Sequence, residues 1–401
     1  MWRSRPWFDC CDLIIQEGRI WRIVQHPDAE GPAPGDRVVD ASGWVLLPGF
    51  INLHAHTPMT VLRDVTEDKP LARWLREEVW PRELRMRSWE LLEGSKAALD
   101  EMLRSGFTTV LDMYRSMDVV GRLAEGRGMR AYLACGLVGW WPLSELGLRG
   151  ALRLRRKFEG SRRVQVALGP HSPRYCPPAY LRRVLNLAGR AGMIVHMHCG
   201  EDPQEAGLWR KRHGYTPAEF LCNQLRGRSA PRVILAHAVH LGDPEIGRLA
   251  ELPVGVAHCP TANVRLLGRT AVVRRLLEAG VPVGLGTDGA PSVGRLDAFS
   301  TIRDCALLAA SGGDDAQLSP MQVLWMATRG GALALGRKEL GQLSPGSAAD
   351  LVALDMELMG TRRPGIKAAC RALVWSARPD QVRMVMVDGI AVWTGRTEGP
   401  S

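Results

Sequence analysis

The sequence lacks the features that would place this protein in a secreted, disulfide-bonded or membrane class. Its nine cysteines include no CxxC pair and no regular spacing, which argues against a disulfide framework and favours reduced thiols in a cytoplasm. No stretch approaches the roughly 18 apolar residues that a membrane span needs. Residues 1–15 contain early arginines but no apolar core of a signal peptide. We therefore expect a cytoplasmic protein that does not bind a membrane.

The sequence also lacks a motif for nucleic-acid recognition, although its net charge is +10. A basic protein of this kind can bind nucleic acid through clustered lysines and arginines. Here arginines such as Arg153, Arg155 and Arg162 fall in helical stretches of surface character. We interpret them as a solvated basic surface and expect no nucleic-acid partner.

Both ends of the chain have the pattern of short strands. Glu17-Gly18 and Asp388-Gly389 each separate two apolar runs, and Asp-Gly is a strong signal for a two-residue β-hairpin turn. Neither end can bury a core by itself, and chain termini often lie close together. We predict a small β-sandwich domain built from residues 1–48 and 341–401.

The middle of the chain alternates short apolar strands with amphipathic helices. Several of these helices, including 89–104 and 179–191, are followed closely by a glycine, as helix ends favour. Eight such units predict a TIM-type (β/α)8 barrel over residues 49–340. The predicted strands are Gly49–His54, Thr108–Met113, Arg130–Cys135, Val164–Leu168, Ile194–His198, Val233–His237, Gly255–His258 and Val283–Thr287.

Histidines and an aspartate stand where the first and last predicted strands end. His54 and His56 are two residues apart, so their side chains point to the same side of the strand. Asp288 follows the eighth strand, and a buried aspartate is costly unless it is paired or bound to a metal. An HxH pair alone is a weak signal, and Asp-Gly alone fits a turn.

The fifth and sixth strands end in the same way. His198 ends the fifth strand with Glu201 three residues on, and His196 on the same face is a competing ligand. His237 ends the sixth strand. Because active sites of this fold lie at the carboxyl ends of the strands, these side chains should converge. Nitrogen and oxygen donors without a thiolate suit zinc or ferrous iron.

These motifs resemble the amidohydrolase superfamily, in its branch of methylthioadenosine/S-adenosylhomocysteine deaminases and related chlorohydrolases. The similarity covers nearly the whole chain, and as a set the motifs are highly specific. They are PGFINLHAHTPMTVLR (48–63), LGPHSP (168–173), HCGE (198–201), LAHAVHL (235–241), AHCPTAN (257–263), GLGTDGAPS (284–292) and GQLSPGSAADLVALD (341–355).

The resemblance implies a role for each residue. It implies that His54, His56, His198 and Asp288 hold one divalent metal ion, with zinc favoured over iron, and it prefers His198 to His196. It also implies that Glu201 shuttles protons, that His237 hydrogen-bonds the reacting oxygen, that Asp288 accepts a proton, and that Glu83 and His171 contact a nucleoside.

Three departures from the family pattern concern the substrate's 5′ end. Cys135 stands where an arginine for an amino-acid carboxylate is expected, and Arg149 or Arg153 is the candidate for a second such arginine. Trp140 and Trp141 replace a polar stretch, and they either line an apolar pocket or pack a loop on the barrel. Gly289–Gly294 also lacks the asparagines that are frequent in the family. Together these departures favour a small or apolar 5′ group.

The resulting hypothesis is hydrolytic deamination of an adenine nucleoside at C6. The expected substrates are methylthioadenosine, 5′-deoxyadenosine or adenosine, with S-adenosylhomocysteine less favoured. One alternative is another heteroaromatic substrate, such as guanine, a pterin or an s-triazine. A more remote alternative is a non-catalytic scaffold, because fold does not fix function. Enzymes of this type are often homo-oligomers, and we expect the same here.

Overall fold

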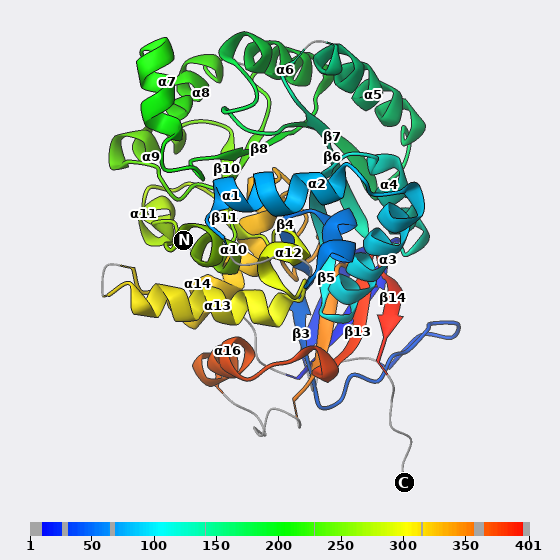
Figure 1. Cartoon of the computed structure of the whole chain (residues 1–401). Coiled ribbons are helices and arrows are strands. Elements are labelled where there is room, and N and C mark those ends of the chain that lie inside the picture. The colour runs from blue at the N-terminus through cyan, green and yellow to red at the C-terminus, as the bar shows by residue number, and fades with distance from the viewer. Residues whose placement is uncertain are drawn as a thin grey trace.

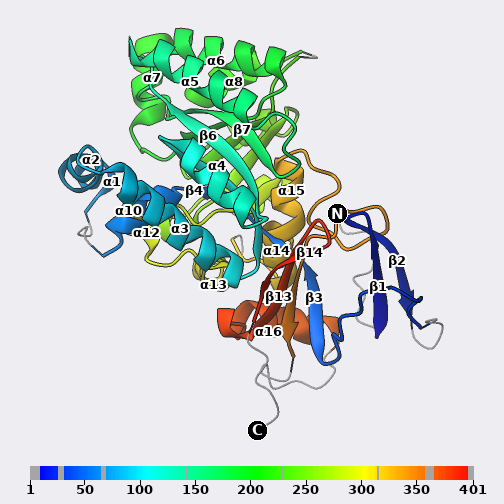
Figure 2. The ribbon, with the colours of Figure 1, turned by 90° about the vertical axis from the view of Figure 1, so that its right-hand side faces the viewer.

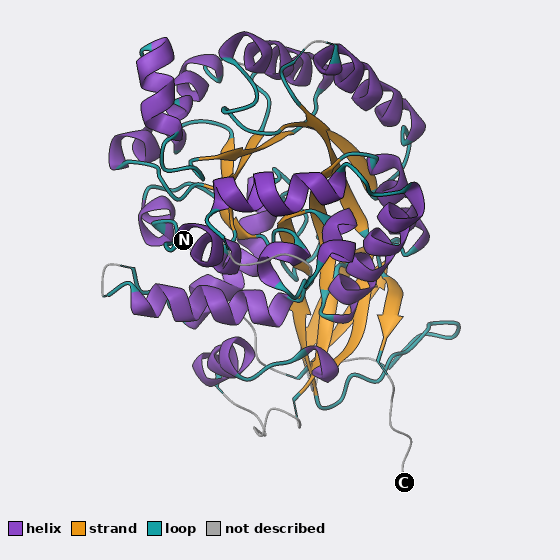
Figure 3. Cartoon of the chain, in the orientation of Figure 1, coloured by secondary structure: helices purple, strands orange, loops and turns teal. Residues whose placement is uncertain are grey.

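The structure is a computed structural model that describes residues 10–25, 31–64, 69–140, 142–227, 229–313, 316–356 and 365–395. Eight parallel strands form a barrel whose helices lie outside it (Figures 1 and 3). This confirms the predicted (β/α)8 barrel, and each predicted strand is present. The barrel strands are β4 (Phe50–Ala55), β5 (Phe107–Tyr114), β6 (Arg130–Leu137), β7 (Val164–Pro170), β8 (Val195–Cys199), β9 (Val233–His237), β10 (Val254–His258) and β11 (Val283–Leu285).

The barrel closes between its first and last strands. Neighbouring strands pair in sequence order from β4 to β11. The last strand is only three residues long, so the closing contact comes from the residues after it: Asp288 forms a parallel bridge with Ala55, and its N–H donates to the His54 carbonyl at 3.0 Å. The seam of the barrel therefore coincides with two of the predicted metal ligands.

Covering helices such as α6 (Pro178–Ala191) bury an apolar face and expose a charged one. Helix α6 shows the pattern: Pro178 occupies its first turn, where a missing N–H costs nothing, and Gly192 ends it in the left-handed conformation at φ 62°. The helices that follow the strands are α3 (Ser88–Arg104), α4 (Met117–Gly126), α5 (Leu143–Lys157), α6 (Pro178–Ala191), α7 (Glu205–His213), α8 (Pro217–Gln224), α9 (Asp243–Leu249), α10 (Pro260–Leu267), α11 (Val273–Glu278), α13 (Ala298–Ser311) and α14 (Pro320–Trp325).

Shorter helical segments occupy the connections after β4 and β11. Helices α1 and α2 lie in front of the barrel strands in Figure 1, and the turned view of Figure 2 agrees. This run carries Glu83 at its end. The segments are η1 (Thr57–Leu62), α1 (Leu71–Trp74), η2 (Leu75–Val79) and α2 (Trp80–Glu83), then α12 (Ala290–Val293), η3 (Met326–Gly330) and α15 (Gly331–Ala334).

The two ends of the chain form antiparallel sheets together, as predicted. A four-stranded sheet has the order β14-β13-β12-β3, so a strand from the N-terminal part pairs with one from the C-terminal part. The β1–β2 hairpin forms a second sheet, and Leu13 and Ile15 pack against Leu351 and Met384 of the first. The elements are β1 (Cys11–Gln16), β2 (Arg19–Gln25), β3 (Trp44–Pro48), β12 (Leu351–Asp355), α16 (Ile366–Trp375), η5 (Pro379–Gln381), β13 (Val382–Val387) and β14 (Ile390–Thr394).

Helix α16 was not anticipated in the terminal part, which the sequence predicted as strands alone. It packs against α13 and α14, the helices that cover the last barrel units. The boundaries at residues 48/49 and 340/341 stay a prediction.

Buried ion pairs join the barrel to the terminal sheets. Arg130 at the start of β6 donates to Asp350 at 2.6 and 3.0 Å, and both side chains are only 4% exposed. Arg130 also pairs with Asp388 in the β13–β14 turn, to which Arg163 donates at 3.0 Å. These contacts fix the barrel's lower rim, at the amino ends of its strands, against the hairpin turns.

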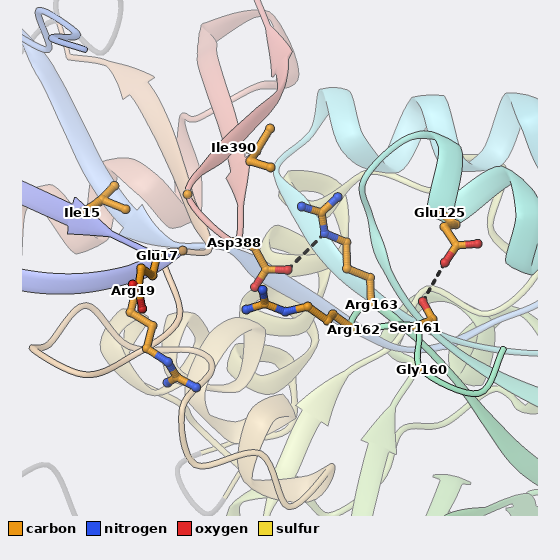
Figure 4. Close-up of a pocket in the computed structure, with 12 residues that line it drawn as sticks. Ile15, Glu17, Arg19, Glu125, Gly160, Ser161, Arg162, Arg163, Asp388 and Ile390 are labelled. Carbon is orange, nitrogen blue, oxygen red and sulfur yellow. Dashed lines mark hydrogen bonds and ion pairs between the residues drawn. The ribbon is translucent and has the colours of Figure 1, made fainter. Parts of the chain in front are cut away.

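A cavity of about 970 Å³ lies at this junction (Figure 4). Its charged groups are largely paired: Arg163 with Asp388, and Glu125 with the hydroxyl of Ser161. It lies at the barrel rim opposite to the histidines.

Among the described residues, none of the helices has the length and apolar character needed to cross a membrane.

Candidate functional site

Three histidines and an aspartate meet at the carboxyl ends of the barrel strands. The Nε2 atoms of His56 and His54 lie 3.2 and 3.4 Å from Oδ1 of Asp288. The Nε2 of His198 lies 3.3 Å from that of His56. The structure thus brings together the four side chains that the sequence nominated as metal ligands.

Hydrogen bonds to Nδ1 determine which nitrogen each histidine presents. His56 Nδ1 donates to the carbonyl of Met113 at 2.5 Å, and His198 Nδ1 donates to the carbonyl of His171 at 2.7 Å. Because a carbonyl can only accept, both protons sit on Nδ1 when the rings are neutral. Each Nε2 is then left with a lone pair that points into the cluster, which is the usual arrangement around a metal ion.

His54 obtains the same tautomer through a second histidine. His196 Nδ1 donates to the carbonyl of Ile234 at 3.1 Å, so the neutral ring accepts at Nε2. His54 Nδ1 donates to that Nε2 at 2.7 Å. The remaining Nε2 of His54 is buried and has no hydrogen-bond partner. His196 therefore contacts the cluster through His54 and does not present its own lone pair to it.

The protonation states suit a divalent cation. Burial lowers the pKa of His54 to about 3 and that of His198 well below its ordinary value, so both rings are neutral. Burial alone would raise the pKa of Asp288, but the adjoining rings of His54 and His56 hold it well below its usual range. Three neutral nitrogens and one carboxylate form a donor set that zinc commonly uses.

His56 is the exception among the histidines. Burial lowers its pKa, but the Asp288 carboxylate more than offsets this and raises it to about 9. Without a metal, the proton on His56 supplies the positive charge that Asp288 needs. A cation bound between them would take over that role and displace the proton.

A second compact set contains His54, His237 and Cys259. Burial raises the pKa of the Cys259 thiol well above its ordinary value, and Asp288 and Glu201 raise it further. A thiol that stays protonated is a poor metal ligand. The first set therefore fits a metal ion better.

Glu201 and His237 lie beside the cluster. His237 Nε2 is 3.6 Å from Oε1 of Glu201, and its Nδ1 is bonded to Asn263 Oδ1 at 2.8 Å. Burial raises the pKa of Glu201 above its ordinary value, and the neighbouring His237 partly offsets this. A carboxyl with a raised pKa next to a histidine can exchange protons near neutral pH. His237 Nδ1 donates this bond, so Asn263 fixes the orientation of the His237 ring.

The backbone is strained at the same place. His237, Ala238 and Asp288 have φ of 73°, 52° and 74°, values that residues other than glycine seldom adopt. Such conformations cluster at functional sites because the surrounding structure must hold them. Ser292 donates to Asp288 Oδ2 at 2.7 Å and thereby helps to fix the carboxylate.

Glu83 lies at the end of α2, close to the end of β5. Its Oε1 accepts a hydrogen bond from Tyr114 Oη at 2.5 Å, and burial raises its pKa. The ring of His171 is 4.7 Å from that of His198 and 5.1 Å from that of Tyr175. Burial lowers the pKa of His171 to about 4, so the ring is neutral.

Aromatic rings surround the neighbourhood of His171. Tyr175 makes edge contacts with Trp80 at 5.7 Å and with Trp140 at 5.9 Å between ring centroids. The Trp140 side chain is 55% exposed, and Trp141 lies outside the described residues. Sequence reasoning missed Tyr175, because one tyrosine in a loop carries no signal of its own.

Among the described residues, no contact joins Arg149 to the cluster. It lies on the exposed side of α5, where its charge helps to lower the pKa of Glu145. Cys135 lies on β6 next to Tyr114 of β5, and burial raises the pKa of its thiol to about 12.

Two other polar groups hold the site without a predicted ligand role. The Asn52 side chain bridges β4 to Thr287, donating at 2.8 Å and accepting at 3.0 Å. Asp112 accepts from the Thr57 backbone N–H at 3.0 Å and from the Thr57 hydroxyl. Both link neighbouring strands and loops around the ligands.

Comparison with known proteins assigns the family. The model of the amidohydrolase family matches residues 45–392. The chain belongs to the amidohydrolase family. A 5-methylthioadenosine/S-adenosylhomocysteine deaminase of Pelotomaculum thermopropionicum is 40% identical over 373 residues, covering 92% of this chain and 84% of that protein. A 5′-deoxyadenosine deaminase of Methanothermobacter thermautotrophicus is 37% identical over 385 residues, covering 94% and 88%.

Solved structures agree with this assignment. An adenosine deaminase from Xanthomonas campestris with bound zinc superimposes with a TM-score of 0.87 at 31% identity, covering 95% of this chain and 88% of that one. The atrazine chlorohydrolase of Arthrobacter aurescens, complexed with zinc, gives 0.84 at 27% identity, covering 95% and 90%. The resemblance inferred from the motifs is confirmed, and so is the expected class of enzyme.

Proposed function

We propose that this amidohydrolase deaminates an adenine nucleoside at C6, giving the inosine analogue and ammonia. The observation that carries the proposal is the convergence of His54, His56, His198 and Asp288, with Glu201 beside them. The names of the relatives support the choice of substrate: one is a 5′-deoxyadenosine deaminase and another a 5-methylthioadenosine/S-adenosylhomocysteine deaminase.

We assign one divalent ion to the three histidines and Asp288, with zinc favoured over iron. The lone pair of the buried His54 Nε2, which has no other partner, supports this assignment. When bound there, such an ion would polarise a water and lower its pKa from 15.7 to about 7.

The side chains around the ligands supply the proton transfers. Asp288 would accept a proton from the attacking water through Oδ1. Glu201, whose pKa burial raises, would donate a proton to the ring nitrogen beside C6 and then help to protonate the departing ammonia. His237, held by Asn263, would hydrogen-bond the oxygen that becomes attached to C6. Acid–base help of this kind is worth roughly 10² to 10⁴ in rate.

Glu83 and His171 would hold the nucleoside's sugar. The Glu83 carboxylate can accept two neighbouring hydroxyls, and it lies on the run α1–α2 in front of the strand ends. Trp140 and Tyr175 would border a small apolar 5′ group. Cys135 offers no charge for a carboxylate, and Arg149 stays a prediction for that role.

The second candidate is a heteroaromatic amine or halide without a ribose, such as guanine, a pterin or an s-triazine. The cluster of Trp80, Tyr175 and Trp140 favours it, because aromatic side chains can pack against any flat heterocycle. The structural similarity to an atrazine chlorohydrolase points the same way. Glu83 separates the two candidates, since a free base has no diol to bind.

The decisive experiment measures ammonia release from the zinc-loaded protein. Methylthioadenosine, 5′-deoxyadenosine, adenosine, S-adenosylhomocysteine, guanine and a triazine amine would be offered in parallel, with chloride release followed for a chlorinated triazine. We expect turnover of the first three, with S-adenosylhomocysteine weaker. Glu83→Gln should raise KM for nucleosides strongly, whereas Glu77→Gln on the same helical run should not.

Two results would contradict the proposal. Ammonia from guanine or the triazine alone would select the second candidate. A protein that retains no metal after growth with added zinc would support a scaffold. Residence in the cytoplasm and homo-oligomer formation stay predictions that these assays do not address.

A further inference from the structure

Tyr114 ends strand β5 and contacts Glu83 directly. Its hydroxyl donates to Glu83 Oε1 at 2.5 Å and lies 3.7 Å from the sulfur of Met86. The tyrosine side chain is only 8% exposed. Neither the family match nor the relatives' names assign it a role.

The next residue holds the same segment by its backbone. Arg115 donates from Nη2 to the carbonyl oxygen of Glu83 at 2.7 Å. Tyr114 at the end of β5 and Arg115 directly after it therefore hold both the carboxylate and the main chain of Glu83. Helix α2 has four residues, so by itself it can fix this side chain only weakly.

The electrostatics make Tyr114 a permanent donor. Burial raises its pKa above the ordinary tyrosine value, and the Glu83 carboxylate raises it further. Burial raises the pKa of Glu83, while the hydrogen bond from Tyr114 opposes that shift and favours the ionised form. Among the described residues, Tyr114 is the only one whose hydroxyl or N–H donates to this carboxylate.

We propose that Tyr114 is a positioning residue that fixes the Glu83 carboxylate for a ribose cis-diol. The inference rests on the proposed function, because it assigns Glu83 to the sugar. Two neighbouring hydroxyls can be accepted together only if the plane of the carboxylate is fixed. One bond to Oε1 sets that plane and leaves Oε2 and the outer lone pair of Oε1 for the ligand. Specificity for the diol thus depends on a residue that does not touch it.

The test compares adenosine with 2′,3′-dideoxyadenosine, which lacks the diol but keeps the base and the 5′ group. Tyr114→Phe should raise KM for adenosine about tenfold, since a hydrogen bond to a charged group is lost. It should leave kcat within about twofold and KM for dideoxyadenosine unchanged. Tyr180→Phe is the matched control: that tyrosine is 7% exposed, and its hydroxyl donates at 3.1 Å to the Ser144 carbonyl, away from the ligands.

A double-mutant cycle adds a readout that general damage would not reproduce. In the background Glu83→Gln, the change Tyr114→Phe should have little further effect on KM for adenosine, because both changes act on one contact. Equal rises of KM for both nucleosides, or full additivity with Glu83→Gln, would overturn the inference.

The outcomes for the two proposals can be told apart. If the wild-type protein turns over no adenine nucleoside, the proposed function fails and the inference fails with it. If it turns over both nucleosides and Tyr114→Phe does not discriminate between them, only the inference fails.

Discussion

Replacing His196 with phenylalanine would remove the acceptor that sets the tautomer of His54. The ring size is nearly kept, but the Nε2 that accepts from His54 Nδ1 at 2.7 Å is lost. In the metal-free protein, His54 can then move its proton to Nε2 and donate toward Asp288 Oδ1, 3.4 Å away. The metal-free fold therefore has a way to avoid an unpaired donor.

In the metal-bound protein, His54 cannot change its tautomer in this way. A cation needs the lone pair of His54 Nε2, so the proton must stay on Nδ1, which would face a phenyl ring. A buried donor left without a partner costs about 1–3 kcal/mol. At about 1.4 kcal/mol per tenfold change, this corresponds to roughly 5- to 150-fold weaker binding. Loss of comparable partners of ligating histidines lowers metal affinity about 10- to 100-fold, so we expect a change within that range.

The assay is competition for zinc against a chromophoric chelator, with thermal unfolding in excess EDTA measured in parallel. His196→Phe should weaken zinc binding 10- to 100-fold with only a small change in the EDTA midpoint. His196→Gln is the matched variant, because its amide oxygen can accept from His54. We expect it to recover most of the affinity.

The reasoning would be refuted by unchanged zinc affinity in His196→Phe. It would also fail if His196→Gln lost as much affinity as His196→Phe, because the acceptor would then be irrelevant. A complete loss of metal in both variants, with a normal fold, would instead make His196 a direct ligand in place of His198.

Three further predictions follow from neighbouring contacts. Glu201→Gln should keep zinc and fold but lose at least about 10²-fold in kcat, because an amide cannot cycle a proton; near wild-type turnover would remove Glu201 from the mechanism. Zinc binding at pH 7.5 should release about one proton, measured by calorimetry in buffers of different ionisation enthalpy. The reason is that metal-free His56, with a pKa of about 9, is protonated at this pH and must become neutral when zinc binds. Zinc affinity should accordingly fall about tenfold for each pH unit below about 9. If zinc binding releases no proton, the charge assigned to His56 is contradicted. Arg130→Met should lower the free energy of unfolding, measured in urea, by about 3–5 kcal/mol, because the Asp350 carboxylate would stay buried without its cationic partner, whereas Asp388 keeps Arg163. A loss below about 1 kcal/mol would mean that the junction does not depend on the Arg130–Asp350 pair.

The barrel could be predicted because its strands are buried on both faces. Such strands are short apolar runs, and the polar residues that end them show where each strand stops. The eighth strand is the informative exception: residues 283–287 were predicted, but β11 ends at Leu285. Thr287 is held by Asn52 instead of by a ladder, and no local pattern signals that contact.

The site was predictable only where a residue type carries chemistry of its own. Histidines and carboxylates at strand ends are rare enough to be conspicuous, so the ligand set could be read from the sequence. Tyr114 and Tyr175 could not, because tyrosine is common in cores and their roles depend on which loop lies opposite. The hydrogen bond from His54 to His196 could be found only in the structure, since the sequence left His196 as a competitor of His198 for the metal.

The seam of the barrel and the ligand cluster share residues, and this explains both the positive φ of Asp288 and the glycine at position 286. The last hydrogen bond that closes the barrel runs from Asp288 N to His54 O, and Asp288 holds φ at 74° to make it. Gly286 permits the approach, because a Cβ there would lie 2.8 Å from that of His54. First and last strands thus meet through residues that present lone pairs to one point. A cation bound there would crosslink β4 and β11, which have no extended ladder of hydrogen bonds between them. Closure of the barrel and binding of the metal ion therefore depend on the same residues, His54 and Asp288.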